Sequence, residues 1–371
     1  MDAFQRLRQG FLVVRPVNAE KGFAGDTGRE TGHVSIKVPL WLRLPFSGHA
    51  LGLPDHDPDE RFRHAPDKRR LHQPPLLQPR FAFAQQQSIA EDGLRFQSVW
   101  QLPLWVPTPA NCRLRGAIRT LDTIIRKIIA IRTAGSRDGA DALSLLLKAR
   151  NDGAAMSDTQ LRDEVMTLLL AGHDTTANTL SWCWFLLAQH PEALEKLRQE
   201  ATEVCHGRFP TAEEFARLQY TRNVVQEAMR LYPPVYVFGR EAVCDTAVAG
   251  YRIRRGTSVL LCQWLVHRDP RFYDRPLEFL PERWDESRVA QLPRYAFFPF
   301  GGGPRVCLGK DLAVVEAGCI LAGLAARFQV SLDAKQKVVP WPTVTLRPRD
   351  GILATVQPAI QSARTQPEIS H

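Results

Sequence analysis

The chain has 371 residues, of which 44% are hydrophobic and 23% charged, so it can bury a large core. No apolar run reaches the roughly 18 residues of a membrane span, and no signal-peptide pattern opens the chain. The net charge of +9 comes from dispersed Lys and Arg, which argues against a nucleic-acid-binding patch. The seven cysteines include no Cys-x-x-Cys pair, so we expect neither a disulfide framework nor a zinc site, and a reducing cytoplasm is the simplest compartment.

The first 95 residues differ from the rest of the chain. Proline, arginine and histidine are frequent, and residues 60–70 are rich in charge without an apolar period. Because proline interrupts helices, no long helix is expected here. We interpret residues 1–95 as an atypical, poorly ordered segment that precedes a folded domain, residues 96–371.

Three helices are predicted in the middle of the chain. Apolar residues recur at helical spacing over residues 114–131 and again over residues 140–148. A third helix begins after Ser157, where Ser-Asp-Thr-Gln fits a capping box, and runs to Trp184. This third helix is apolar almost all round, so we expect it to lie buried in the core.

Residues 171–176, Ala-Gly-His-Asp-Thr-Thr, interrupt that apolar helix. Gly172 removes side-chain bulk, while Asp174 and Thr175 are an acid and an alcohol that can relay protons. The alternative is that the threonines only donate hydrogen bonds back to helix carbonyls.

Glu227 and Arg230 lie one helical turn apart and can form an ion pair. Most pairs at this spacing are solvated and contribute only tenths of a kcal/mol. Further on, the chain carries Arg240, then His267 ahead of Arg-Asp-Pro, and then the segment Pro-Glu-Arg-Trp at residues 281–284. By themselves, Arg240 reads as a surface arginine and His267 as a turn residue.

Residues 300–309, Phe-Gly-Gly-Gly-Pro-Arg-Val-Cys-Leu-Gly, set Cys307 in a glycine-rich, basic loop. Arg305 and a following helix, predicted over residues 311–328, would both favour a thiolate, the form of cysteine that binds metal. One face of this helix is expected to be buried: Leu312, Val315, Cys319, Leu321 and Leu324. A phosphate loop fails because Pro304 and Asp311 stand at required positions, whereas a buried, inert cysteine is the bland alternative.

The pattern Phe-x-x-Gly-x-Arg-x-Cys-x-Gly resembles the haem-ligand signature of the cytochrome P450 monooxygenases, and the motifs at residues 171–176, 227–230 and 281–284 follow that family's order. The resemblance extends from about residue 96 to residue 358. It implies a mainly α fold with a small β portion, of which the N-terminal part is incomplete or atypical, and haem b bound through iron to Cys307.

The resemblance also implies roles for particular residues. Asp174 and Thr175 would deliver protons during dioxygen activation. Glu227, Arg230 and Arg283 would form a buried structural network. The residues expected to contact haem are Gly172, Arg240, His267, Phe300, Gly301, Arg305, Cys307 and Gly309, among which Arg240, His267 and Arg305 would bind the propionates.

The implied reaction is hydroxylation of an apolar substrate, such as a fatty acid or terpenoid, with O2. Because no dinucleotide or flavin motif occurs, electrons would come from a separate ferredoxin or flavoprotein. Arg305 and Lys310 would steer an acidic donor of this kind.

Two departures keep other readings open. Trp284 stands where the family has Phe, and the family's early Trp-x-x-x-Arg motif is missing. One alternative is a truncated or decayed remnant that binds haem weakly and has no activity. Another is a redox-sensing thiol protein that uses Cys307 without haem.

Overall fold

The computed structural model describes residues 12–14, 103–135, 141–151, 156–206, 208–333 and 335–359. Apart from residues 12–14, the segment predicted to be atypical lies outside these ranges. Within them helices dominate, and the strands are short and form small separate sheets. The predicted mainly α fold with a small β portion is therefore confirmed.

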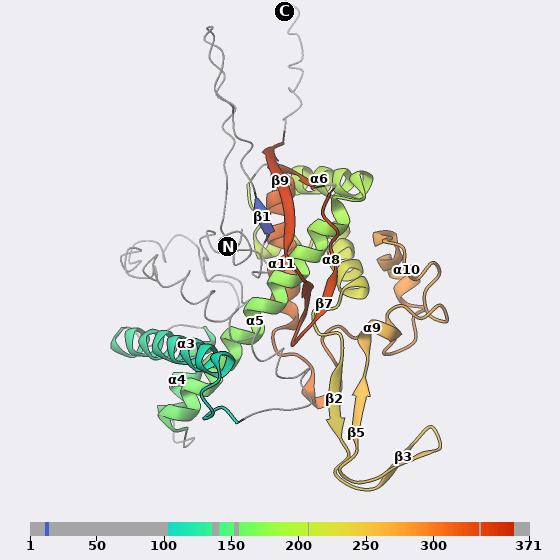
Figure 1. Ribbon diagram of the computed structural model, residues 1–371. Helices are drawn as coiled ribbons and strands as arrows, with labels where there is room; N and C mark the ends of the chain where they lie inside the picture. The colour runs from blue at the N-terminus through green and yellow to red at the C-terminus, as the bar shows by residue number, and fades with distance from the viewer. Residues whose placement is uncertain are drawn as a thin grey trace, which may run out of the picture.

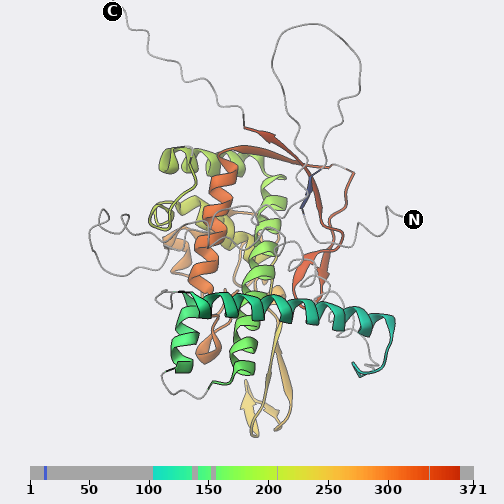
Figure 2. The ribbon, with the colours of Figure 1, turned by 90° about the vertical axis from the view of Figure 1, so that its left-hand side faces the viewer.

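The first two helices match the prediction. Helix α3 (Pro109–Ala134) begins at Thr108, whose hydroxyl accepts a hydrogen bond from the Asn111 backbone N–H, with proline at the first helical position. It packs against α4 (Ala142–Asn151) and crosses α5, as Figure 2 shows. The apolar spacing sets which side chains it buries: Leu114, Leu121, Ile124 and Ile125.

Helix α5 (Asp158–Leu187) is the central element of the fold (Figure 1). Its predicted start is confirmed, because the Ser157 hydroxyl accepts from the Gln160 backbone N–H. The expectation that it is buried all along is only half right. Helices α6, α8 and α11 enclose its C-terminal half, whereas in the other half Leu168 is 43% exposed and the adjoining Ala171 and Gly172 are exposed too.

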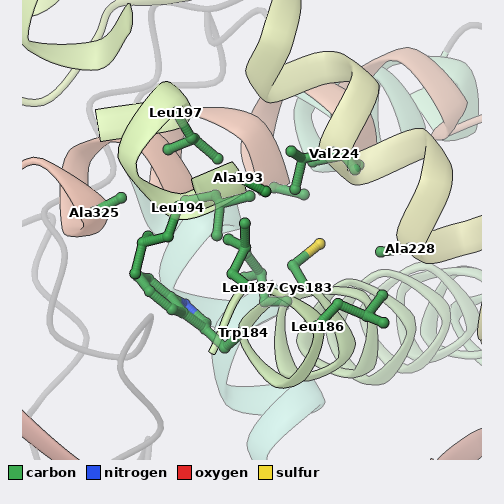
Figure 3. Packing of buried hydrophobic residues seen from close by; sticks show 14 of the residues in the cluster. Cys183, Trp184, Leu186, Leu187, Ala193, Leu194, Leu197, Val224, Ala228 and Ala325 are labelled. Atoms are coloured by element: carbon green, nitrogen blue, oxygen red, sulfur yellow. The ribbon is translucent and has the colours of Figure 1, made fainter. Parts of the chain in front are cut away.

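The main core forms where α5 meets α6 (Pro191–Cys205), α8 (Gln219–Leu231) and α11 (Lys310–Ala325). Figure 3 shows side chains from these helices pointing toward one another, with Leu187 and Leu197 among the fully buried ones. This packing fixes the position of α11 relative to α5, and therefore the position of the loop that precedes α11.

Helix α11 begins close to its predicted start but ends at Ala325, because Phe328 already belongs to a strand. Leu321 and Leu324 are buried as predicted, whereas Leu312 is 53% exposed. The apolar period continues into the first turn of the helix, yet that turn projects beyond the core helices. A periodic pattern therefore overestimates burial at this end of the helix.

Short helical turns connect the longer elements. They are α7 (Ala212–Phe215), α9 (Gln263–Val266), η4 (Pro281–Trp284), α10 (Glu286–Val289) and η5 (Gly303–Arg305). Two of these short elements bond to α8. Arg230 of α8 donates to the carbonyl of His267, which directly follows α9, and Arg283 of η4 donates to Glu227 of α8.

The strands among the described residues form one three-stranded and three two-stranded sheets. In order β1-β9-β6, the first joins Leu12–Val14, Ile352–Pro358 and Phe328–Leu332, with β1 parallel and β6 antiparallel to β9. The other pairs are antiparallel: β2 (Phe238–Glu241) with β5 (Ser258–Leu261), β3 (Thr246–Val248) with β4 (Tyr251–Ile253), and β7 (Pro340–Pro342) with β8 (Leu346–Pro348). Figure 1 shows the β2–β5 ribbon extending away from the helices.

Candidate functional site

Cys307 lies in an exposed loop three residues before α11. Its backbone N–H donates to the Phe300 carbonyl at 3.0 Å, and the Gly301 N–H donates to the Phe298 carbonyl at 3.0 Å. These bonds fold residues 298–307 into a tight turn. In Figure 2 α11 runs beside the C-terminal half of α5, so the turn lies level with the middle of the longer helix.

Two glycines of this loop are needed by the backbone itself. Gly301 and Gly303 have φ of +73° and +67°, in the left-handed region that side chains disfavour. Gly302 is needed for a different reason, since a Cβ there would lie 2.6 Å from Cε1 of Tyr295. The loop glycines therefore allow the turn around Cys307 to close.

The middle of α5 presents the predicted acid and alcohol. The Thr175 hydroxyl donates to the Ala171 carbonyl at 2.7 Å, which is the helix-internal bond that the sequence left as an alternative. Gly172 is exposed, and a Cβ built there would meet nothing within 4 Å. This stretch of α5 is therefore exposed on one side, next to the polar side chains of Asp174 and Thr175.

Asp174 is held by partners that the sequence analysis missed. Its Oδ2 accepts from the Thr345 hydroxyl at 2.5 Å and from the Asn178 amide at 3.0 Å, and Asn178 also donates to Thr345. Burial raises the pKa of the Asp174 carboxyl, and the Thr345 hydrogen bond and the charge of Arg347 oppose that rise. The carboxyl is thus fixed in place and favours its protonated form more than an exposed aspartate does.

The β7–β8 hairpin is attached to α5 along one stripe of that helix. Asp174, Asn178 and Trp182 follow one another at four-residue spacing, and the Trp182 indole donates to the Leu346 carbonyl at 3.1 Å. The hairpin is also held from the other side, because the Leu346 N–H donates to the carbonyl of Pro234. None of these contacts was predicted from the sequence.

The predicted network around Glu227 is present and buried, with Glu227 and Arg230 completely so. Arg230 donates from Nε and Nη2 to the two carboxylate oxygens at 2.8 and 2.9 Å, and Arg283 donates from Nε at 3.2 Å. The Leu280 backbone N–H and the Trp284 indole add two more donors. Five donors around one carboxylate lock α8 to η4, and the expectation of a structural rather than catalytic role agrees with this geometry.

The two arginines predicted to anchor a cofactor are both exposed. Arg240, on β2, donates only to the neighbouring Gly239 carbonyl and lies over the Phe238 ring. Arg305 ends η5, two residues before the cysteine. Neither forms a salt bridge with a carboxylate in the described ranges, so both guanidinium groups are available to an anionic ligand.

His267 lies in a different environment from that expected of a cofactor ligand. Its imidazole is completely buried, and Nε2 accepts a hydrogen bond from the Phe298 backbone N–H at 3.0 Å. The ring packs against Phe297 and Phe298. The structure therefore gives the side chain a protein partner, inside the loop that leads to Cys307.

A family model for cytochrome P450 matches residues 83–355. This chain belongs to the cytochrome P450 family. The match covers the cysteine loop, the acid and alcohol of α5 and the Glu227 network, which are the features that carried the resemblance in the sequence. None of the helices that the structure describes is long and apolar enough to cross a membrane.

Relatives of this P450 include named oxygenases. It is 38% identical over 244 residues to cyclooctatin synthase of Streptomyces melanosporofaciens, covering 65% of this chain and 53% of that protein. Identity is 36% over 267 residues to putative cytochrome P450 132 of Mycobacterium tuberculosis (70% and 57% covered) and 35% over 236 residues to pentalenene oxygenase of Streptomyces avermitilis (63% and 53%). The chain thus spans about half the length of the curated relatives it matches.

The surroundings of Cys307 fit the haem that the family implies. Leu308, next to the cysteine, is 95% exposed, and Val306 and Leu312 are exposed as well. A group of uncovered apolar side chains around one thiol is typical of a ligand-binding surface. Haem offers a flat apolar ring, an iron for the thiolate and two carboxylates for free arginines, so the residues present in this P450 fit it.

Proposed function

We propose that this chain is the haem-thiolate part of a monooxygenase that uses O2 to hydroxylate an apolar substrate, such as a terpenoid or fatty acid. Among the relatives, pentalenene oxygenase and cyclooctat-9-en-7-ol 5-monooxygenase carry names that support both the reaction and the apolar substrate class. The observation that carries the proposal is the exposed Cys307 thiol in a glycine loop tied to the core.

Cys307 would bind the iron of haem b through Sγ. Phe300, Gly301 and Gly309 would lie along one face of the ring and Gly172 along the other. Arg305 and Arg240 would bind the propionates, because a guanidinium donates two parallel hydrogen bonds to a carboxylate. When bound, a haem with thiolate ligation binds O2 and favours cleavage of the O–O bond.

Asp174 and Thr175 would supply protons to this reaction. The carboxyl of Asp174 has a raised pKa and only Oδ2 is engaged by Thr345 and Asn178. Oδ1 can therefore hold a proton more readily than the carboxyl of an exposed aspartate does. The Thr175 hydroxyl donates to the Ala171 carbonyl but keeps its acceptor lone pairs, so it can receive a hydrogen bond from the reacting side.

The substrate would lie against the open side of α5. Leu168 and Ala171 are exposed apolar residues one turn and one residue before Gly172. A bound apolar molecule would cover them and exclude water from the reacting atoms. This burial would supply most of the affinity, at about 25 cal/mol for each Å² of apolar surface removed from water.

Electrons would come from a separate acidic ferredoxin or flavoprotein. Arg305 is exposed beside the cysteine, and Lys310, whose Nζ lies 3.9 Å from Asp311 Oδ1, is half exposed. These cations would steer a negatively charged donor toward the cysteine loop. A reducing cytoplasm would keep Cys307 and the six other free cysteines in the thiol form.

The test is a carbon monoxide difference spectrum of the full chain, expressed with haem supplied and then reduced. We expect the strongly red-shifted Soret band of thiolate-ligated haem. The band should persist in Cys244→Ser, which changes another exposed cysteine, and vanish in Cys307→Ser. Wild-type protein without the band would overturn the proposal and favour the inactive-remnant reading.

A further inference from the structure

The backbone of Phe298 is held at both polar atoms by side chains from a single short element. Its carbonyl accepts from Gln263 Nε2 at 2.6 Å, and its N–H donates to His267 Nε2 at 3.0 Å. Gln263 begins α9 and His267 directly follows it, so the two lie four residues apart on one face. Both are completely buried. We call this pair of contacts the Phe298 clamp.

The clamp lies at the base of the cysteine loop. The Phe298 carbonyl also accepts from the Gly301 N–H, and the next turn is closed by the bond from the Cys307 N–H to Phe300. The direction of the Phe298 peptide therefore sets where the loop starts. A small rotation there would move the thiol at the end of the loop.

The other end of the clamp is fixed to the buried ion network. The His267 carbonyl accepts from Arg230 Nη1 at 2.8 Å, and Arg230 holds Glu227 with two further hydrogen bonds. The imidazole ring packs against the rings of Phe297 and Phe298, whose centroids each lie 5.1 Å from its own. His267 thus connects the buried Glu227 network to the loop that carries the cysteine.

The charge state of His267 agrees with this arrangement. Nε2 can accept the Phe298 N–H only when it carries no proton. Burial, together with the positive charges of Arg230 and Arg268, lowers the pKa of the imidazole to about 3, so it stays neutral at ordinary pH. A buried ring whose Nε2 already accepts a hydrogen bond is poorly suited to donate from that atom to a propionate.

We propose that His267 is a positioning residue, whose Nε2 fixes the Phe298 backbone and thereby orients the Cys307 thiolate, rather than a propionate ligand. The part that concerns the thiolate rests on the proposed function, since it assumes that Cys307 binds haem. The part that concerns Phe298 does not, because the hydrogen bond exists in the protein alone. The two parts can therefore be measured separately.

The test compares three variants of the full chain. His267→Gln keeps an acceptor at the position of Nε2, His267→Leu removes it, and His190→Leu removes another imidazole, whose Nδ1 bonds to the Leu186 carbonyl away from the loop. If His267→Leu does not fold, His267→Asn replaces it, because the shorter side chain places its acceptor out of reach of Phe298.

The first measurement is hydrogen exchange at the Phe298 amide in protein without haem. We expect about tenfold faster exchange in His267→Leu, the equivalent of one lost hydrogen bond, and near wild-type exchange in His267→Gln and His190→Leu. The second is the carbon monoxide difference spectrum. In it His267→Leu should lose most of its thiolate band to the band of haem without thiolate, and His267→Gln should keep the band.

Each result decides one part of the proposal. Unchanged exchange in His267→Leu, or equal acceleration in Leu and Gln variants, would overturn the role at Phe298. If the Phe298 amide exchanges faster in His267→Leu as expected but this variant keeps a full thiolate band, the link to the thiolate is overturned. A wild-type protein without any thiolate band would instead overturn the proposed function, while the exchange data would still decide whether His267 holds Phe298.

Discussion

The indole N–H of Trp284 donates a hydrogen bond of 3.0 Å to Oε2 of Glu227. Phenylalanine, which the resemblance leads one to expect at this position, has no such donor. The departure at Trp284 therefore adds one charge-assisted hydrogen bond to a carboxylate that has no access to solvent.

Trp284→Phe should consequently destabilise the protein by more than its lost volume explains. The matched control is Trp184→Phe. Trp184 is equally buried, at 4% against 3% exposed, and its indole N–H donates to none of the described residues. We expect the Trp284 variant to cost about 1.5–3 kcal/mol more than the control, the value of a hydrogen bond to a charged group. Urea unfolding of both variants measures the difference; equal losses would contradict it.

Close packing along α11 gives a second prediction. A Cβ on Gly318 would lie 2.1 Å from Cε2 of Phe215, a buried ring that cannot easily move. Gly318→Ala should therefore destabilise the fold by about 1–3 kcal/mol. Gly116→Ala in α3, where a Cβ would meet nothing within 4 Å, should instead stabilise it by about 0.5–1 kcal/mol. Thermal unfolding should move in opposite directions for the two variants.

Buried histidines should make the protein sensitive to acid. Burial lowers the pKa of His173 to about 4 and that of His267 to about 3, so the unfolded chain binds more protons than the folded one below pH 6.5. The contribution of the two neutral imidazoles to the free energy of unfolding is fully present above that pH. It is lost as the pH falls, by about 1.4 kcal/mol per pH unit for each histidine.

His267→Gln removes the imidazole that takes up one of these protons when the chain unfolds. Between pH 6.5 and pH 5 its free energy of unfolding should fall by about 2 kcal/mol less than that of the wild type, whatever the substitution costs at neutral pH. Asp174 and Glu316, whose pKa values are raised by burial and act in the opposite sense, contribute equally to both proteins. Urea unfolding at the two pH values measures this change. If the variant and the wild type lost the same free energy of unfolding between them, the assignment would be contradicted.

The Asp174 carboxyl should respond to its hairpin partner. Because the Thr345 hydrogen bond lowers the carboxyl pKa, Thr345→Val should raise it further. The folded protein would then hold that proton to higher pH, and stability would decrease as pH rises through the new pKa. Infrared spectra can follow the protonated carboxyl band, with Asp174→Asn to identify it; a band that titrates at the wild-type pH would contradict the prediction.

The sequence predicted those features that local spacing encodes. The start of α5 at Ser157, the helix around Leu121 and the meeting of Glu227 with Arg230 follow from caps and from side chains one turn apart. Each of these features depends on residues within a single helix, so it can be predicted without knowing where distant parts of the chain lie. Arg283 was expected in the network only through the family resemblance, and the structure brings it there.

Features decided by tertiary packing could not be predicted. Leu312 continues an apolar period but lies beyond the core, and nothing near His267 distinguishes a turn residue from a buried acceptor. Thr345 is 171 residues from Asp174, with no pattern linking the two. The contacts that hold the candidate acid therefore become visible only in the folded chain.

That separation also affects the order of events during synthesis. Asn178 and Trp182 leave the ribosome with the rest of α5, but Thr345 and Leu346 emerge more than 160 residues later. Domains fold as they are made, and contacts between distant segments form late because long loops must close first. The nascent helix will therefore expose the Asp174–Asn178 pair and the Trp182 indole until the β7–β8 hairpin has been made, so this stripe of α5 stays open to other contacts for most of the synthesis of the segment between them.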